Sequence, residues 1–259
     1  QRQMCIRDSC TCLVENADRT QLEAVLKRVS GETGVSLTAV YEGNTAKITA
    51  AGVQAHASTP DEGKNAITAT LQALCALPLA QGAAEKTVQQ LHELFPYGDN
   101  RGKALGIAME DAVSGCLTLT FSMVHLDSTG FWGVFDSRDP LCATEENTCH
   151  VTEAKMAAFG WECKGSLGPA HAVDGESDFI KVLLNAYETY TGRKGYCEAI
   201  GGGTYVHEIP GGVAFGAGEH DFDSHLHGAN ERARISQLLK TAMIYALAIS
   251  KLCACCLLY

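Results

Sequence analysis

The sequence predicts an α/β protein, with a two-layer arrangement of strands and helices followed by a part that contains two long helices. Apolar residues in the first 165 positions switch repeatedly between the period of a strand and the period of a helix. Leu117, Leu119, Phe121 and Met123 alternate with mostly polar neighbours, which is typical of a half-buried strand. After position 165, strand patterns become rare and two long helical patterns remain. These three observations favour a two-layer α/β domain and a second segment.

The first layer opens with a strand, a helix and two paired strands. These elements are predicted at 11–15, 18–31, 35–41 and 45–53, with a turn at 42–44. Ile67, Leu71 and Leu74 recur at helical spacing before Pro78, so a helix is predicted at 63–77. Further helices are predicted at 85–95, 103–113 and 145–159, and further strands at 116–125, 131–137 and 161–165.

The second segment begins after a stretch of Gly, Pro and small polar residues at 165–176. It is predicted to contain a helix at 178–191, strands at 196–200 and 212–216 around a glycine-rich loop, and a last helix from Glu231. Residues 1–9 show neither periodicity, and we expect them to be a non-native tail. The predicted domains are therefore 10–167 and 168–259.

Charge and hydropathy exclude two classes of partner. Twenty Lys and Arg stand against thirty Asp and Glu, a formal charge of −10, which repels phosphate backbones and anionic lipid. We therefore predict no nucleic-acid partner. The longest apolar stretch, at 241–259, is interrupted by Ser250 and Lys251, so no membrane span is assigned.

The twelve cysteines show no paired CxxC spacing, which argues against a zinc ribbon. The N-terminal residues contain no apolar signal region. We therefore expect reduced thiols and a cytoplasmic protein.

His56 lies where a predicted strand turns toward a helix, so its ring can project from a rigid element into a cleft. A surface or capping role is the alternative. Ser58 is close in sequence, but no G-x-S-x-G pattern supports a serine hydrolase.

The run Gly201, Gly202, Gly203 and Thr204 follows a predicted strand and can bring backbone N–H groups close to a carboxylate or oxyanion. A plain tight turn is equally compatible with it. No phosphate-loop lysine follows, so a nucleotide site is disfavoured.

Residues 219–231 carry three histidines among several carboxylates, a set of ligand atoms suited to Zn²⁺ or Mn²⁺. A solvated acidic loop is the alternative. Composition does not indicate which of His220, His225 and His227 would bind.

The motifs occur in a characteristic order. Ala-His-Ala-Ser-x-Pro-x-x-Gly-x-Asn-Ala begins at Ala55, Asp-Ser-Arg-Asp-Pro ends at Pro140, Gly-Gly-Gly-Thr-Tyr begins at Gly201, the strand-like run 211–216 follows, and His-x-x-Asn-Glu begins at His227. This order resembles the metal-dependent peptidase family that includes aminoacylases and succinyl-diaminopimelate desuccinylase. Its dipeptidase branch, the Sapep-type and Xaa-His dipeptidases, is the most similar.

The resemblance implies a two-part enzyme. Residues 10–167 would be a lid domain, and 168–259 the C-terminal part of an α/β metallopeptidase catalytic domain. The N-terminal catalytic half, which carries the other metal ligands and the general base, is expected to be missing, so the chain alone should be inactive.

The resemblance also implies roles for single residues. His227 would bind one ion of a Zn²⁺ or Mn²⁺ pair, His56 would stabilise the oxyanion, and Arg138 would hold the carboxylate of a dipeptide substrate. Gly202, Gly203 and Thr204 would line the substrate pocket. His207 and Asp139 depart from the residues common in the family, an Arg and a Tyr. A deacylase or desuccinylase, and a non-catalytic α/β binding or dimerisation module, are the alternatives.

Overall fold

The computed structural model describes residues 8–216, 221–222, 224–225 and 230–256. The chain forms two units, each described here by itself. The first contains Gln1–Gly168 and Ala199–Gly202, and the second contains Pro169–Glu198 and Gly203–Tyr259.

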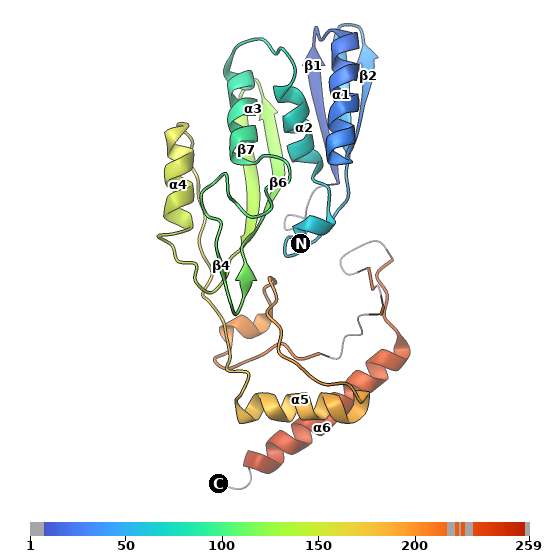
Figure 1. Cartoon of the computed structure of the whole chain (residues 1–259), viewed down its shortest axis with the longest axis vertical. Coiled ribbons are helices and arrows are strands. Elements are labelled where there is room, and N and C mark those ends of the chain that lie inside the picture. Colours follow the sequence, from blue (N-terminus) through green and yellow to red (C-terminus); the bar gives the residue numbers. More distant parts are fainter. Residues whose placement is uncertain (1–7, 217–220, 223, 226–229, 257–259) are drawn as a thin grey trace. The chain divides into compact units, whose positions relative to one another are not determined.

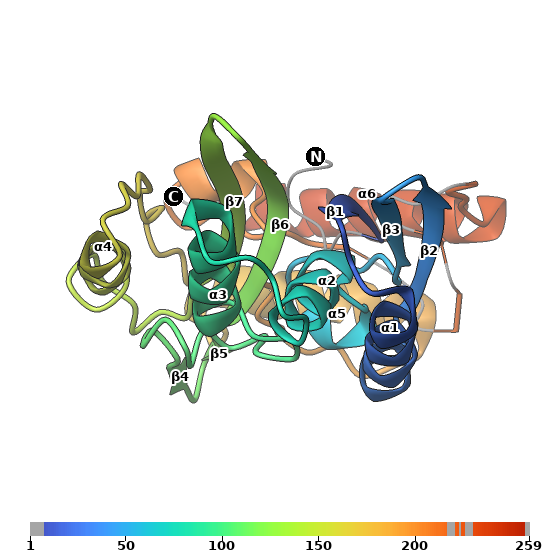
Figure 2. The ribbon, with the colours of Figure 1, turned by 90° about the horizontal axis from the view of Figure 1, so that it is seen from above.

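The first unit consists of small antiparallel sheets with helices packed on them (Figure 1). Its elements are β1 (Ser9–Glu15), α1 (Arg19–Thr33), β2 (Ser36–Glu42), β3 (Thr45–Ala51), η2 (Pro60–Glu62), α2 (Ala66–Cys75), α3 (Ala83–Leu94), β4 (Glu110–Asp111), β5 (Gly115–Cys116), β6 (Thr118–Asp127), β7 (Gly130–Arg138) and α4 (Cys149–Ala158). Strands β1, β3 and β2 form one sheet in that order, and β6 and β7 form a hairpin. Figure 2 shows α1, α2 and α3 in one layer and these strands in the other. The predicted two-layer α/β class is confirmed.

Local signals account for the first helix and the sheet beneath it. Asp18 caps α1 by accepting from the Gln21 amide at 2.8 Å, and Gly34 ends the helix with a φ of 68°. In β3 the residues alternate between buried and exposed, and Ala46, Ile48 and Ala50 face the helices. The sheet therefore buries one face under α1 and α2.

Strand β1 turns two thiols toward this core. Cys10 and Cys12 are partly buried against it, and burial raises the pKa of Cys12 to about 12. The nine cysteines whose side chains the structure describes are all free thiols. Ser9 pairs with Ala51 in the same sheet, so β1 includes the last residue of the expected tail at 1–9. Residues 1–7 lie outside the described part.

Asn65 joins the two halves of the first unit. Its side-chain oxygen accepts from the amides of Ile67 and Thr68 at the start of α2, and its Nδ2 donates to the Phe121 carbonyl of β6 at 2.8 Å. Asn65 is buried, and α2 packs on β1, β3 and β6. One side chain therefore caps a helix and ties it to the hairpin.

The helix predicted at 103–113 is wrong. Gly102 and Gly106 have φ values of 72° and 82°, in the left-handed region that interrupts a right-handed helix. The carboxylate of Asp99 accepts from the amides of Lys103 and Ala104, at 3.1 and 2.7 Å, and so supports a turn. The segment continues into the short β4–β5 hairpin.

Three predicted strands, at 161–165, 196–200 and 212–216, are also wrong. These segments have no strand assignment and join no sheet among the described residues. A strand needs a neighbour for its backbone N–H and C=O groups, and sequence alone does not supply that neighbour.

The second unit is built on two helices, α5 (Asp178–Thr191) and α6 (Ile235–Cys256), with the 3₁₀ turn η3 (Tyr205–Glu208) between them in sequence. Ile180, Leu183, Ala186, Ile244 and Ala248 form their shared core. The last helix begins four residues later than predicted.

Much of the apolar surface of α6 is exposed. Ile235 is 76% exposed, Leu239 63% and Ile249 61%. By length and composition Ile235–Ala254 could cross a membrane, although the core helix of a soluble protein meets the same test.

Candidate functional site

His56 lies between β3 and η2, and Ser58 contacts its ring at Nδ1. Its Nδ1 is 2.7 Å from the hydroxyl of Ser58 and accepts from the Ser58 amide at 3.2 Å. A backbone N–H can only donate, so Nδ1 is the acceptor nitrogen of the neutral ring. Nε2 then carries the proton and is a hydrogen-bond donor, as an oxyanion-stabilising histidine requires.

The backbone around His56 is tied to the rest of the first unit. Thr118 Oγ1 donates to the Ala57 carbonyl at 2.8 Å in a buried position. Asp61, four residues after Ala57, accepts from Arg101 Nη2 at 2.5 Å and from Asn100 Nδ2 at 2.8 Å. The segment is therefore anchored on both sides of Ser58.

Arg138 ends β7, and its guanidinium is already paired. Nε donates to Asp136 Oδ1 at 2.7 Å, and Nη2 lies 3.4 Å from Oδ2. Only 14% of the Arg138 side chain is exposed. The pair fixes the plane of the guanidinium and leaves Nη1 outside it, a geometry suited to receiving a carboxylate.

Asp139 follows Arg138 and is partly buried. Burial raises the pKa of its carboxyl group, and Asp136 adds to the rise, whereas the Ser137 hydroxyl and Arg138 oppose it. Ser137 Oγ donates to Oδ2 at 2.8 Å, but the buried Oδ1 has no hydrogen-bond partner among the residues that the structure describes.

Gly201 brings the glycine-rich loop against both predicted site segments. A Cβ added at Gly201 would lie 3.0 Å from the Cβ of Ser58 and 3.4 Å from the Cβ of Arg138. Only a residue without a side chain fits there without displacing a neighbour. Three segments that are distant in sequence therefore meet at this point.

The rest of the predicted loop is divided between the units. Gly202 belongs to the first unit with Gly201, whereas Gly203 and Thr204 belong to the second. The Thr204 amide donates to His207 Nδ1 at 3.2 Å. The His207 ring lies 5.2 Å from that of His171, whose Nε2 donates to the Gly212 carbonyl at 2.6 Å.

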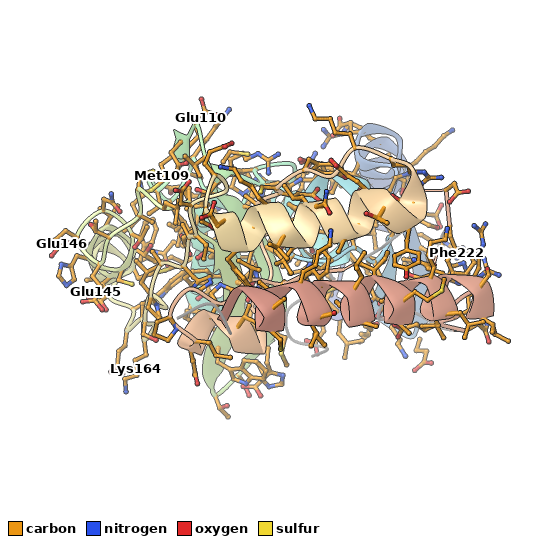
Figure 3. All side chains as sticks on the ribbon, turned by 90° about the horizontal axis from the view of Figure 1, so that it is seen from below. Met109, Glu110, Glu145, Glu146, Lys164 and Phe222 are labelled. Carbon is orange, nitrogen blue, oxygen red and sulfur yellow. The ribbon has the colours of Figure 1, made fainter. Side chains whose placement is uncertain are left out.

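The predicted metal ligand, His227, lies outside the described residues, as does His220. His225 is described, and its Nε2 lies 3.5 Å from the Arg232 guanidinium, a cation that disfavours a metal ion at that nitrogen. Arg232 and Arg234 each place a guanidinium over the ring of Phe222, 5.8 and 4.6 Å from its centroid. Figure 3 labels Phe222. No group of three or more His, Cys, Asp or Glu among the described residues could hold a metal ion.

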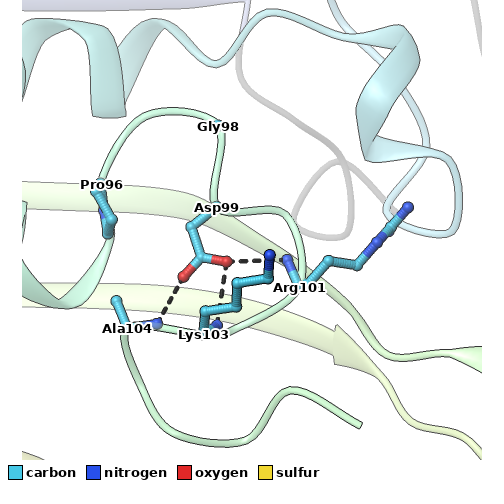
Figure 4. Close-up of a pocket in the computed structure, with 6 residues that line it drawn as sticks. All are labelled: Pro96, Gly98, Asp99, Arg101, Lys103 and Ala104. Carbon is cyan, nitrogen blue, oxygen red and sulfur yellow. Dashed lines mark hydrogen bonds between the residues drawn. The ribbon is translucent and has the colours of Figure 1, made fainter. Parts of the chain in front are cut away.

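A hollow of about 540 Å³ lies on the first unit, lined by Pro96, Gly98, Asp99, Arg101, Lys103 and Ala104 (Figure 4). Its carboxylate, Asp99, is occupied by the amides of its own loop. None of the predicted site residues lines it, so this hollow is not the candidate site.

Sequence reasoning missed the contacts of Ser58 and Gly201. Both belong to recognised motifs, yet only the fold shows that Ser58 holds the His56 ring and that Gly201 packs on Ser58. The pairing of Arg138 with Asp136 had a possible signal, because residues two apart on a strand face the same side.

Comparison with known proteins finds a domain family that matches part of this chain. Residues 39–126 match the family described as "Peptidase dimerisation domain", of the M20 peptidases. The match runs from β2 into β6 and includes His56 and Asn65. This segment of the chain is therefore similar to an M20 peptidase dimerisation domain.

Proteins named as dipeptidases are similar to this chain over most of its length. It is 31% identical over 209 residues to the Beta-Ala-Xaa dipeptidase of Lactobacillus delbrueckii subsp. lactis, covering 80% of this chain and 44% of that protein. It is 28% identical over 248 residues to the "Putative dipeptidase YtjP" of Bacillus subtilis, covering 95% of this chain and 53% of that protein. The chain spans about half the length of the curated relatives it matches.

Proposed function

We propose that this chain is part of a metal-dependent dipeptidase. It supplies a hydrogen-bond donor to the oxyanion and a side chain that binds the substrate carboxylate. The observation that carries the proposal is the meeting of Ser58, next to His56, with Arg138 at Gly201. Hydrolysis of a dipeptide needs both groups, because the scissile carbonyl gains negative charge while the terminal carboxylate must be held.

Each side chain has a separate task. The Nε2–H group of His56 donates to the oxygen of the tetrahedral intermediate. The guanidinium of Arg138, oriented by Asp136, pairs with the substrate carboxylate. The family resemblance assigns Gly202, Gly203 and Thr204 to the lining of the substrate pocket.

The described residues do not by themselves form a metal site. A pair of Zn²⁺ or Mn²⁺ ions, with His227 as one ligand, rests on the family resemblance and needs further ligands and a general base from outside the described residues. Two features support a larger catalytic protein. Segments 196–200 and 212–216 have strand-like sequences without sheet neighbours in the described part, and α6 exposes apolar residues. We also propose a cytoplasmic location for this protein.

Metal analysis and peptide hydrolysis test the proposal. The chain alone should hydrolyse no Ala- or His-containing dipeptide with added Zn²⁺ or Mn²⁺. A chimera that joins it to the unmatched part of the Bacillus subtilis relative should be active. Rapid turnover by the chain alone, or no dipeptide hydrolysis by a folded chimera with two bound ions, would contradict the proposal. Preference for N-acyl or N-succinyl substrates would favour the deacylase alternative.

Variants of the chimera separate the roles. His227→Ala should lose one metal ion and nearly all activity, and His225→Ala should keep both ions. His56→Ala should keep the metal while kcat falls by about 10²–10³. Loss of metal in His225→Ala but not in His227→Ala would overturn the assignment.

Self-association is a second candidate function, favoured by the matched dimerisation domain. Strands β1 and β2 are the edges of their sheet in the described part, so each can accept another strand. Sedimentation equilibrium of the chain over a range of concentrations tests this function, and a monomer throughout would argue against it.

A further inference from the structure

We propose that Ser58 is a positioning residue, which holds the His56 ring with its proton on Nε2. This role deepens the proposed dipeptidase function and rests on it. Ser58 touches the ring at the nitrogen opposite the one that would donate to the substrate.

The two contacts from Ser58 differ in what they allow. The hydroxyl, 2.7 Å from Nδ1, can donate or accept, but the amide, 3.2 Å from the same nitrogen, can only donate. Together they favour the tautomer in which Nδ1 has a lone pair. They also fix the plane of the ring, since two donors converge on one atom.

Ser58 is itself held from three sides. The Thr59 amide donates to the His56 carbonyl at 3.0 Å and closes a turn over Ser58. Thr118 fixes the preceding carbonyl, that of Ala57. Gly201 packs against the Ser58 Cβ, so the side chain has little room to move away from the ring.

In catalysis, Ser58 would orient the His56 ring without contacting the substrate. A histidine whose proton moves to Nδ1 presents a lone pair to the oxyanion and repels it. By holding Nδ1 as an acceptor, Ser58 keeps the donor aimed at the reaction without touching the substrate.

Nitrogen NMR of the chain tests the geometry without metal or substrate. Long-range ¹H–¹⁵N correlation on histidine-labelled protein, at a pH where the rings are neutral, shows which ring nitrogen carries the proton; His56→Gln assigns the signals. We expect the proton on Nε2. In Ser58→Ala the ¹⁵N chemical shift of Nδ1 should move toward that of a ring nitrogen that accepts fewer hydrogen bonds. The control Ser30→Ala, which removes a serine hydroxyl bonded to the Leu37 amide at 3.0 Å, should leave His56 unchanged.

A proton on Nδ1 in the unmodified chain would overturn the proposal even if Ser58→Ala does not fold. An unchanged His56 spectrum in a folded Ser58→Ala variant would also overturn it. Because this measurement needs no activity, it is separate from the dipeptidase assay, whose failure would refute the proposed function alone.

Kinetics of the active chimera then test the positioning role. Ser58→Ala should lower kcat about tenfold, the value of one hydrogen bond, with little change in KM. Added to His56→Ala, the same substitution should cause no further loss, because its effect passes through the ring. A further tenfold loss in the double variant would show a role independent of His56 and overturn the proposal.

Discussion

Replacing Asn65 with alanine should destabilise the first unit more than the loss of an ordinary helix cap. The cap on α2 contributes about 0.5–2 kcal/mol. The lost donor also leaves the Phe121 carbonyl without its partner in a buried position, which costs about 1–3 kcal/mol more. We therefore expect the free energy of unfolding to fall by about 1.5–5 kcal/mol.

Urea titration followed by tryptophan fluorescence measures this loss, because Trp132 and Trp161, the two tryptophans, both belong to the first unit. Asp18→Ala is the matched control. Asp18 caps α1 through one exposed hydrogen bond from the Gln21 amide and, among the described residues, does not join α1 to a second element. Asp18→Ala should therefore lower the free energy of unfolding by about 1 kcal/mol. Equal losses in the two variants would refute the idea that Asn65 ties helix to hairpin.

Three further changes have defined outcomes. Gly52→Ala would place a Cβ 2.0 Å from the Lys64 carbonyl oxygen, so we expect a loss at or above the upper end of about 1–3 kcal/mol in the same titration; a loss below 1 kcal/mol would contradict the close approach. Because burial raises the pKa of Asp139, the folded state binds that proton more tightly than the unfolded state, and stability from this group is lost as pH rises through the raised pKa. Asp139→Asn should remove this fall in urea titrations across acidic pH, and identical pH profiles would contradict it. In the active chimera, Arg138→Lys should raise the KM for dipeptides about tenfold with unchanged metal content, since an ammonium cannot reproduce the two-point pairing with Asp136; an unchanged KM would remove Arg138 from substrate binding.

Residue spacing and capping residues predicted the helices and strands whose ends are set by neighbouring residues in the sequence. The helix at 178–191 has its predicted bounds, because Ser177 caps it and Gly192 ends it with a φ of 67°. The paired strands β2 and β3 follow from alternation around a short turn. In contrast, the segment predicted as a helix at 103–113 is not one, although it buries Leu105 and Ile107. Its glycine conformations and carboxylate bonds, which residue spacing does not show, decide the result.

The sequence indicates candidate site residues one by one but not how they are arranged in space. His56 and Arg138 each belong to a motif that sequence reveals. Ser58, which contacts His56, and Arg138 both pack against Gly201, which is far from both in sequence. The spacing of apolar residues along the sequence does not reveal such a contact. His227 stays a prediction, because it lies outside the described residues.

The irregularity in β6 has a consequence for how this protein tolerates changes in length. The register with β7 shifts between Phe121 and Met123, and Thr118–Ser122 is buried at every position, whereas the strand beyond is partly exposed. The inner half carries the bonds to Ala57 and Asn65. An added residue there would turn side chains to the opposite face and pull on the segment that holds His56. The turn after Asp127 carries neither of these two bonds, so a label or an affinity tag can be attached there. The hairpin can also be lengthened at this turn without changing the contacts around His56.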